Sequence, residues 1–441
     1  MIRDFYRHRS ILLTGVPGFV GKGVLAKVMA DLPEVARIYV LSRQRHRADG
    51  SVVEAAERLE AECFATSLFD RFRSTDPDGF AAAREKVVPI TGDITKDELG
   101  CDAEIYARLL DDVDLIIANA ATVEFDAPLD FSLDLNTLGP QRLLEFARAC
   151  RRDAVMVQVS TAYVNGQLPG LLVERPLPIN RTIRQMIDEA PTSFDPDREV
   201  EACKGACERI RRTAASEAQR EAFRREILDQ GKGRQPTPKR VEKLVDDRCN
   251  NWLKRELVRE GMERARAYGW HDVYTFTKGM GEQLLVKHQG DVPLVIVRPS
   301  VIESSLKDPE PGWISGLKVS DPLIVAYGRG LVPDFPAARD SVMDLIPVDI
   351  VVNGILAAAG RAAESIGGEV PVFHIASGSE NPITNNQLFR LMKNYFHESP
   401  MRGRNGEIPE LPEWSFPSQK RFRTLFNLKY MYPLDAVQWL V

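Results

Sequence analysis

The sequence predicts an α/β protein in which helices cover both faces of a doubly wound parallel β-sheet. Short apolar segments recur between residues 10 and 297, helical patterns separate them, and the first apolar segment ends in a glycine-rich turn. Continuous apolar strands are typical of parallel sheets, because both faces of such a sheet are buried. Hydrophobic residues make up 44% of the 441 residues and charged residues 27%, so the chain can bury a full globular core.

Six segments have the pattern of buried strands. They are Ser10–Thr14, Ala36–Ser42, Val87–Ile90, Val113–Asn119, Val155–Ser160 and Pro293–Val297. Helical patterns occupy Val20–Asp31, Glu54–Phe69, Ser132–Cys150 and Val273–His288. Because helices separate many of the strands, the chain can return to the same edge each time and the strands can run parallel.

A strongly charged segment interrupts this alternation. We assign residues 181–269 to a helical insertion, with helical patterns at Arg198–Gln230 and Lys239–Tyr268. The glycine and proline residues of Gly231–Pro238 predict a loop between these two patterns. The sheet domain then comprises residues 1–180 and 270–305.

Residues 306–441 are predicted to form a smaller mixed α/β domain that binds substrate. Its clearest elements are helices at Val348–Arg361 and Thr384–Phe396 and a strand at Val370–Ala376. The chain stops at Val441 within an apolar stretch, so we expect this domain to be truncated there.

Composition argues against several classes of protein. A net charge of −5 gives no reason to expect nucleic-acid binding. The six cysteines form no C-x-x-C pair and the six histidines do not cluster, so we expect neither a metal site nor a disulfide framework. The sequence has no signal-peptide pattern and no apolar stretch of the ~18 residues that span a membrane. We therefore expect a cytoplasmic protein, whose contact with a membrane would be peripheral.

The turn after the first strand predicts a dinucleotide site. It reads Thr14-Gly15-Val16-Pro17-Gly18-Phe19-Val20-Gly21, with the spacing G-x-x-G-x-x-G. Glycines at these places allow a tight turn, a close approach of the backbone to a diphosphate, and close packing of helix on strand. The helix that follows presents free N–H groups and a partial positive charge to the phosphates. This combination is typical of the Rossmann fold.

The end of the second strand favours NADPH over NAD. An NAD site normally has a carboxylate there, which binds the ribose 2′-hydroxyl. This strand instead ends in Leu41-Ser42-Arg43, and Arg45 and Arg47 follow. A guanidinium would pair with a 2′-phosphate, which a carboxylate would repel. The alternative is that these arginines form a solvated surface run.

A possible catalytic set lies near the last predicted strands. Tyr274 and Lys278 are four residues apart at the start of a helix, so both side chains share one helix face. A phenol, with a free pKa of about 10, can donate a proton to a carbonyl that receives hydride, and a nearby ammonium would lower that pKa. A hydroxyl after the fifth strand can bind the same carbonyl oxygen. Thr161 is our first choice for it and Ser160 the second.

Together these motifs resemble the extended short-chain dehydrogenases/reductases. Further segments resemble the alcohol-forming fatty acyl-CoA reductases of the male-sterility type. They are Gly18–Lys22, Phe69–Arg73, Gly92–Ile94, Asn119–Ala121, Val297–Val301, Pro311–Trp313, Pro347–Asn353 and Ser377–Thr384. The resemblance covers Ser10–Thr384 apart from the charged insertion, and the motifs are specific as a set rather than singly.

The resemblance implies a role for each matching residue. Thr161, Tyr274 and Lys278 would be the catalytic triad, and the last two would also contact the cofactor. The other cofactor contacts would be Thr14, Gly15, Gly18, Phe19, Val20 and Gly21 at the diphosphate, Ser42 and Arg43 at the 2′-phosphate, Asp93 and Ile94 at the adenine, Asn119, Ala120 and Ala121 at the ribose, and Pro299 and Val301 at the nicotinamide. Asn136 matches a structural asparagine of the family.

The implied activity is the NADPH-dependent reduction of a long-chain fatty acyl-CoA to an aldehyde and on to a fatty alcohol, with release of CoA. Such an enzyme would serve lipid metabolism, for example wax ester synthesis. Two features depart from the family pattern. The insertion separates Thr161 from Tyr274 by far more residues than usual, and the C-terminal domain of the family is not all present.

Other functions stay open at this point. The same fold could reduce carrier-protein thioesters or fatty aldehydes, act on nucleotide sugars as an epimerase or dehydratase, or bind NADP without catalysis as an interaction protein. The insertion could line the acyl-CoA entrance, form a solvated face, or lie on a membrane surface. In the first case the cations that would meet the CoA phosphates are Arg198, Lys204, Arg209, Arg211 and Arg212.

Overall fold

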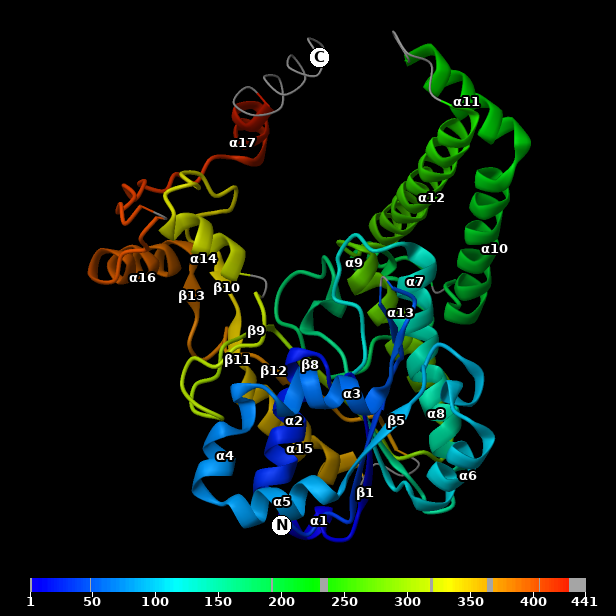
Figure 1. The fold of residues 1–441 in the computed structure, drawn as a ribbon, viewed down its shortest axis with the longest axis vertical. Coiled ribbons are helices and arrows are strands. Elements are labelled where there is room, and N and C mark those ends of the chain that lie inside the picture. Colours follow the sequence, from blue (N-terminus) through cyan, green and yellow to red (C-terminus); the bar gives the residue numbers. More distant parts are fainter. Residues whose placement is uncertain are drawn as a thin grey trace. The chain divides into compact units, whose positions relative to one another are not determined.

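The computed structural model describes residues 2–47, 49–191, 193–230, 237–317, 320–362, 368–403 and 405–427 (Figure 1). The chain divides into two compact units. The first comprises Met1–Pro299, Lys307–Glu310 and Asp349–Ile375, and the second comprises Ser300–Leu306, Pro311–Val348 and Ala376–Val441. In the described residues no helix is long and apolar enough to cross a membrane.

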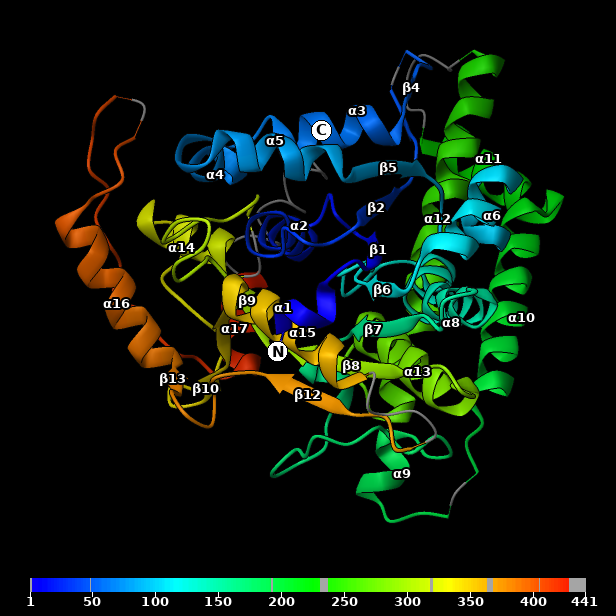
Figure 2. The same ribbon diagram turned by 90° about the horizontal axis from the view of Figure 1, so that it is seen from below.

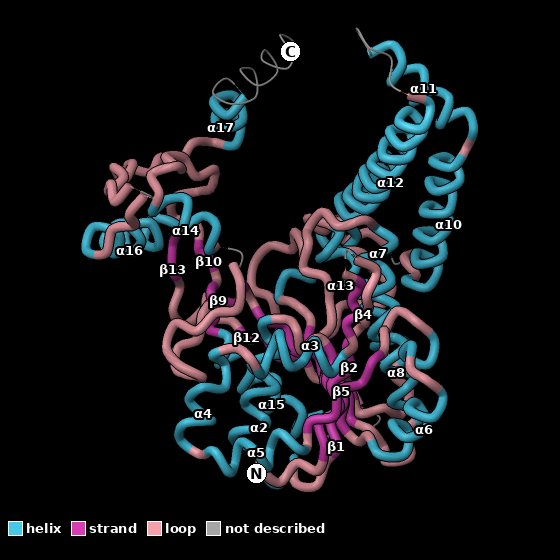
Figure 3. Tube along the Cα trace, viewed as in Figure 1, coloured by secondary structure: helices cyan, strands magenta, loops and turns pink. Residues whose placement is uncertain are grey.

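The first unit is built on a parallel sheet, whose strands are magenta in Figure 3. Its seven described strands lie in the order β12-β8-β7-β6-β1-β2-β5, which can be followed in Figure 2. The strands are β1 (Ser10–Thr14), β2 (Arg37–Ser42), β5 (Val87–Thr91), β6 (Leu115–Ala118), β7 (Val155–Val159), β8 (Leu294–Pro299) and β12 (Val372–Ile375). The chain runs outward from β1 through β2 to β5, then returns to β6 and runs outward in the other direction. This reversal confirms the predicted doubly wound Rossmann sheet. In such sheets ligands bind beyond the carboxyl ends of the strands at the reversal, which here are β1 and β6.

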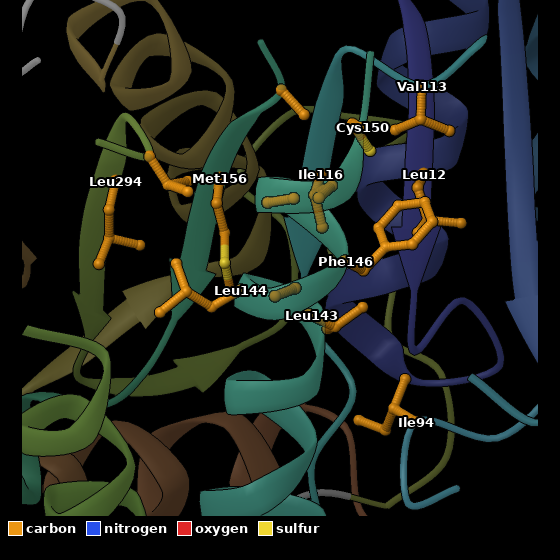
Figure 4. Close-up of a cluster of buried hydrophobic side chains, with 14 of the residues drawn as sticks. Leu12, Ile94, Val113, Ile116, Leu143, Leu144, Phe146, Cys150, Met156 and Leu294 are labelled. Atoms are coloured by element: carbon orange, nitrogen blue, oxygen red, sulfur yellow. The ribbon is translucent and has the colours of Figure 1, made fainter. Parts of the chain in front are cut away.

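The core of this sheet contains side chains from each strand around the reversal point (Figure 4). Leu12 on β1, Ile116 on β6 and Met156 on β7 are fully buried, and Phe146 of α8 (Gly139–Ala149) packs over them. Burying each large apolar side chain contributes about 1.5–3 kcal/mol. The sheet therefore forms a rigid base for the loops at its carboxyl edge.

Helices flank the strands. Those of the first unit, besides α8, are α1 (Ile2–Tyr6), α2 (Phe19–Asp31), α3 (Ala55–Leu59), α4 (Asp70–Thr75), α5 (Pro77–Glu85), α6 (Ala103–Asp112), α7 (Leu129–Leu133), α9 (Ile183–Ile187), α10 (Pro196–Ala215), α11 (Glu217–Gln230), α12 (Pro238–Tyr268), α13 (Val273–His288) and α15 (Val348–Ala362). The helix expected at Glu54–Phe69 breaks after α3 into a π-helical segment, Glu60–Phe64, and a 3-10 turn, Ser67–Phe69.

The helix expected at Ser132–Cys150 also has a break. A π-helical segment, Asp134–Leu138, joins α7 to α8. Pro140 has no N–H, so it cannot donate to the carbonyl of Asn136 four residues earlier. That carbonyl instead faces α13 at Gly281, where an added Cβ would lie 2.5 Å from it. The break therefore allows the segment around Asn136 to pack closely against the helix that carries Tyr274 and Lys278.

The charged insertion is helical, with α10 and α11 following one another and both packed against α12 (Figures 1 and 2). The long pattern expected at Arg198–Gln230 divides at Ser216, which ends α10. Arg220 and Arg224 on α11 form ion pairs with Glu242 on α12. Of the expected loop Gly231–Pro238, residues 231–236 lie outside the described residues, and Pro238 already belongs to α12.

The second unit contains two small sheets and three helices among its described residues. β9 (Val301–Glu303) pairs in parallel with β11 (Leu345–Pro347), and β10 (Val342–Met343) pairs antiparallel with β13 (Ile383–Thr384). The helices are α14 (Asp321–Gly328), α16 (Asn385–Glu398) and α17 (Gln419–Phe426). Their core is aromatic, with Tyr327, Phe389, Phe396 and Trp414 packed together.

The boundaries of the units differ from those expected. We assigned residues 306–441 to one C-terminal domain and residues 270–305 to the sheet domain. The structure instead returns Asp349–Ile375 to the first unit and assigns Ser300–Leu306 to the second. The reason is strand pairing, because β12 extends the main sheet beside β8, with Phe373 opposite Val297. The expected truncation at Val441 lies outside the described residues.

Candidate active site

The glycine turn has the close contacts that its spacing predicts. Gly15 has φ +73°, in the left-handed region that favours glycine, and an added Cβ would lie 2.8 Å from the backbone nitrogen of Ala120. The Gly18 N–H donates to the Gly15 carbonyl at 3.0 Å. A side chain at Gly21 would clash with the same carbonyl. The three glycines therefore allow α2 to begin directly over the end of β1.

Thr14 links the turn to the next strand across the sheet reversal. Its Oγ1 accepts hydrogen bonds of 3.0 Å from the N–H groups of both Asn119 and Ala120, just beyond β6. The Asn119 amide donates in turn to the Gly15 carbonyl at 3.4 Å. Ala121 is the next residue and is partly buried. The predicted diphosphate and ribose segments thus lie together at the carboxyl ends of β1 and β6.

These residues fit a dinucleotide diphosphate. Gly18 precedes α2 in an extended conformation, and no side chain caps this helix. Phe19, Val20 and Gly21 form its first turn, where backbone amides and the positive end of the helix dipole favour an anion. Gly15, Gly18 and Gly21 have no side chain at the turn, so the backbone there can approach the phosphates.

Three arginines follow the end of β2, at positions 43, 45 and 47. Ser42 is buried and Arg43 is exposed. Arg47 forms an ion pair with Glu57, whereas neither Arg43 nor Arg45 has a carboxylate partner in the part of the chain that the structure describes. Two guanidinium groups are therefore available to an anionic ligand at this edge.

Asp93 and Ile94 follow β5. The Asp93 carboxylate accepts from the N–H of Thr95 at 2.9 Å and from its hydroxyl at 2.8 Å, so it stabilises its own turn. The Ile94 side chain is buried in the core, where its Cδ1 lies close to Gly139. Their expected place beside an adenine stays a prediction.

The three expected catalytic residues come together at the carboxyl end of β7. The Lys278 Nζ donates a hydrogen bond of 3.0 Å to the carbonyl oxygen of Val159. The Thr161 side chain lies close enough to the Tyr274 phenol to act on its pKa, which it lowers. The Thr161 Oγ1 accepts from the N–H of Tyr163 at 3.3 Å, so its own proton can point towards the phenol oxygen. Lys278 and Thr161 are only 3% and 5% exposed.

Ser160, the second choice, has different surroundings. Its N–H donates to the carbonyl of Val297 at 2.7 Å, and its Oγ is buried without a hydrogen-bond partner among the described residues. The hydroxyl that acts on the pKa of Tyr274 therefore belongs to Thr161, one residue further along the chain.

The long insertion leaves and rejoins the site at one place. The N–H of Gln167 donates to the carbonyl of Gly269 at 3.0 Å, and the indole of Trp270 donates to the carbonyl of Val164 at 2.7 Å. Trp270 is fully buried. These contacts explain how Thr161 and Tyr274 can be neighbours although the insertion lies between them in sequence.

Burial dominates the electrostatics of the pair on α13. It raises the pKa of Tyr274 to about 12, the Thr161 side chain acts in the opposite direction, and Asp272 raises the pKa further. Burial lowers the pKa of Lys278 to about 8, and Glu282 opposes this shift. We expected the Lys278 ammonium to lower the pKa of the Tyr274 phenol. In the structure burial has the largest effect on this pKa and raises it. At neutral pH Tyr274 is thus a proton donor, and Lys278 is largely cationic.

Comparison with known proteins identifies the family. Residues 13–355 match the family model described as male sterility protein. Fatty acyl-CoA reductase 1 of Arabidopsis thaliana is 34% identical over 440 residues, which cover 99% of this chain and 80% of the relative. The chain belongs to the male-sterility family of fatty acyl-CoA reductases. It therefore has an NAD(P)-binding domain and is a reductase, as the motifs predicted.

A further relative and two solved structures are consistent with this family and its fold. The alcohol-forming fatty acyl-CoA reductase of Simmondsia chinensis is 29% identical over 440 residues, covering 99% of this chain and 80% of that protein. Among solved structures, the terminal R domain of the myxalamid pathway has a TM-score of 0.54 at 19% identity, covering 96% of this chain and 75% of that one. A reductase domain from a Mycobacterium tuberculosis peptide synthetase has a TM-score of 0.52 at 18% identity, with coverages of 95% and 75%. These likenesses show the fold.

The last two expected nicotinamide contacts belong to different units of the reductase. Pro299 ends β8, is buried, and lies opposite Ile375 of β12 in the first unit. Val301 begins β9 in the second unit. Their role stays a prediction. Asn136, expected to be structural, donates to the Thr277 hydroxyl at 3.2 Å and accepts from the N–H of Thr122 at 3.0 Å.

The cations expected at the acyl-CoA entrance differ in their availability. Arg211 forms an ion pair with Asp130, and Lys204 pairs with Glu201. Three others are exposed and have no ion-pair partner within the described ranges. They are Arg198, Arg209 and Arg212.

The sequence did not suggest Phe125 as a site residue of the reductase. Its ring lies edge-on to that of Tyr274, with centroids 6.0 Å apart, and its carbonyl accepts from the N–H of Val273 at 3.3 Å. Phe125 is 50% exposed and nearby Val123 is 69% exposed. The sequence feature that could have indicated Phe125 is its pairing with Val123, since both are apolar residues in an otherwise polar loop directly after Asn119–Ala121.

Proposed function

We propose that this reductase uses NADPH to reduce long-chain fatty acyl-CoA to an aldehyde and then to a fatty alcohol, with release of CoA. The observation that carries the proposal is that the Thr161 hydroxyl, the Tyr274 phenol and the buried Lys278 ammonium come together at the carboxyl end of β7. The relatives named fatty acyl-CoA reductases support the choice of substrate class. We also propose the cytoplasmic location that the sequence suggested, with any membrane contact peripheral.

The residues of the site suit thioester reduction. When bound, NADPH would supply a hydride to the carbonyl carbon. Thr161 and Tyr274 would donate hydrogen bonds to the carbonyl oxygen as negative charge develops there, and Tyr274 would transfer its proton. The resulting hemithioacetal breaks its C–S bond, which yields the aldehyde and the free thiol of CoA. A second hydride and a second proton convert the aldehyde to the alcohol at the same hydroxyls.

Lys278 would act on the cofactor side. Its position one helical turn after Tyr274 places its ammonium on the same face of α13. There it could bind the ribose hydroxyls and favour negative charge on the nearby oxygens. The carbonyl of Val159 holds the ammonium at the end of β7.

Two surface features support the finer assignments. Arg43 and Arg45, which lack carboxylate partners in the described chain, would bind the 2′-phosphate of NADPH. Phe125, whose exposed ring lies beside the Tyr274 phenol, and the exposed Val123 two residues before it would contact the acyl carbons next to the thioester, since exposed apolar side chains suit a hydrocarbon substrate. Arg198, Arg209 and Arg212 would be available to the CoA phosphates.

The test is consumption of NADPH with palmitoyl-CoA, followed by gas chromatography of the product. The proposal expects fatty alcohol and stoichiometric free CoA. Aldehyde alone would limit the enzyme to the first reduction. No consumption with palmitoyl-CoA, but consumption with an acyl group on a carrier protein, would overturn the acyl-CoA assignment. NADPH binding without turnover of any thioester or aldehyde would overturn the proposal that the protein catalyses these reductions.

A further inference from the structure

A buried ion pair lies one helical turn beyond Lys278. Glu282 on α13 and Arg298 on β8 are 2% and 0% exposed. The Arg298 Nε donates to the two carboxylate oxygens at 3.0 and 3.2 Å, and its Nη2 donates to Oε2 at 2.5 Å. Removing two charges from water is costly, and apolar residues of similar volume often give equal or greater stability. Stability alone therefore does not account for this pair.

Glu282 lies on the same helix face as Lys278. The two residues are four apart on α13, so their side chains are neighbours. Glu282 is the charged group that raises the pKa of Lys278 against the effect of burial. No carboxylate forms a hydrogen bond with Lys278 in the described residues, and its Nζ contacts the carbonyl of Val159 instead. The ammonium thus depends on Glu282 for nearby negative charge.

Arg298 fixes the position of that carboxylate from the sheet. Its Nη1 lies 3.3 Å from the Nε2 of His374 on β12. Burial and the Arg298 charge lower the pKa of His374, so this ring is a neutral acceptor at pH 7. The Glu174 carboxylate accepts from the backbone N–H of His374 at 2.7 Å. The guanidinium is therefore held on both sides, between Glu282 and His374.

We propose that the Glu282–Arg298 pair is a positioning element, in which Glu282 keeps Lys278 in its charged form at the end of β7 and Arg298 holds the carboxylate in place. The charged groups around this element are Lys278 and Glu282 on α13, Arg298 on β8, His374 on β12, and Glu174 in the loop after β7. Asp272 acts on Tyr274 at the other end of the triad. The inference rests on the proposed function where it assigns Lys278 to the cofactor ribose.

The test is the pH dependence of NADPH affinity, measured by fluorescence titration without acyl-CoA. Wild-type affinity should weaken around pH 8, where Lys278 loses its proton. Glu282→Gln should move this midpoint downwards by about one pH unit, a typical size for the effect of one neighbouring charge. Arg298→Lys keeps the positive charge but loses the forked geometry, so it should lower Tm and leave the midpoint near its wild-type value.

Two further variants separate positioning from folding. Glu199→Gln breaks a comparable pair in the insertion, where Glu199 accepts from Arg264 at 2.5 Å. It should lower Tm without moving the midpoint. If Glu282→Gln does not fold because Arg298 is left unpaired, the double variant Glu282→Gln/Arg298→Gln leaves no buried charge alone and should show the same downward shift.

The outcomes distinguish this inference from the proposed function. A folded Glu282→Gln or double variant with the wild-type midpoint would overturn the inference, whatever its Tm. A wild-type protein that binds NADPH with the expected midpoint but reduces no thioester would overturn the proposed function and leave the positioning role in place. Turnover of acyl-CoA by the wild type, together with an unshifted midpoint in the variants, would support the proposed function and overturn the positioning role of Glu282.

Discussion

The Nζ of Lys278 lies 3.0 Å from the carbonyl oxygen of Val159, the last residue of β7. Thr161 lies two residues beyond that carbonyl, and Tyr274 lies one turn before Lys278 on α13. The hydrogen bond therefore fixes the helix that carries the phenol and the ammonium at the strand end that carries the hydroxyl. The whole helical insertion extends outwards from between these two segments.

The hydroxyl of Thr161 should matter far more than that of Ser160. Thr161→Ala should lower kcat by about a hundredfold, since it removes a hydrogen bond to developing negative charge. Thr161→Ser should recover much of this loss. Ser160→Ala is the control, because the Ser160 Oγ has no partner among the described residues, and it should stay near wild type in steady-state assays. The reverse ranking would move the catalytic hydroxyl to Ser160.

Arg43 should determine the preference for NADPH. Arg43→Ala should raise the KM for NADPH about tenfold, the equivalent of one hydrogen bond to a charged group, and leave the KM for NADH unchanged. Arg47→Ala is the matched control, since Arg47 is paired with Glu57. Steady-state kinetics with both cofactors checks this. Equal effects of Arg43→Ala on NADPH and NADH would show that Arg43 does not bind the 2′-phosphate.

Phe125 should contribute to recognition of the acyl chain. Phe125→Ala should raise the KM for long-chain acyl-CoA by about tenfold, because each methylene that loses its contact costs about 0.8 kcal/mol. Acetyl-CoA or butyryl-CoA kinetics should change little. Phe131→Ala removes another partly exposed phenylalanine and serves as the control. If Phe125→Ala slowed all chain lengths equally, Phe125 would be acting on Tyr274 instead.

Activity should fall as pH rises through the pKa of Lys278. Burial lowers this pKa to about 8, so the ammonium is present below that pH and is lost above it. The pKa of Tyr274 is about 12, so the phenol keeps its proton over the same range. A plot of kcat/KM against pH should therefore decline above pH 8 with a slope of one proton. Lys278→Met should have low activity without this decline, and a wild-type profile that is flat to pH 10 would refute the role of Lys278.

The sequence predicted those structural features around the candidate site that depend on local pattern. The bounds of α13, Val273–His288, were predicted correctly, since Asp272 caps its first turn and the charged insertion ends just before it. Gly15, Gly18 and Gly21 were identified by spacing, and the contacts at each of them give the physical reason.

Features that depend on contacts between distant segments were missed. β12 was recognised as a strand but assigned to the wrong unit, because nothing in its own residues shows that it pairs with β8. The π-helical break at Asn136 results from Pro140 together with packing against Gly281. The helical pattern of the sequence alone does not predict this break. The Glu282–Arg298 pair left only a weak signal, two charged residues within otherwise apolar segments.

The central claim is that Tyr274 gives its proton to a carbonyl that receives hydride from NADPH. The most direct test is mass spectrometry of the product formed from palmitoyl-CoA and NADPH that carries deuterium at the transferred position of C4. The account predicts one deuterium at C1 of the aldehyde or two at C1 of the alcohol, and a rate at least about a hundredfold lower in Tyr274→Phe with unchanged NADPH affinity. Product without deuterium, or wild-type rates in Tyr274→Phe, would contradict it.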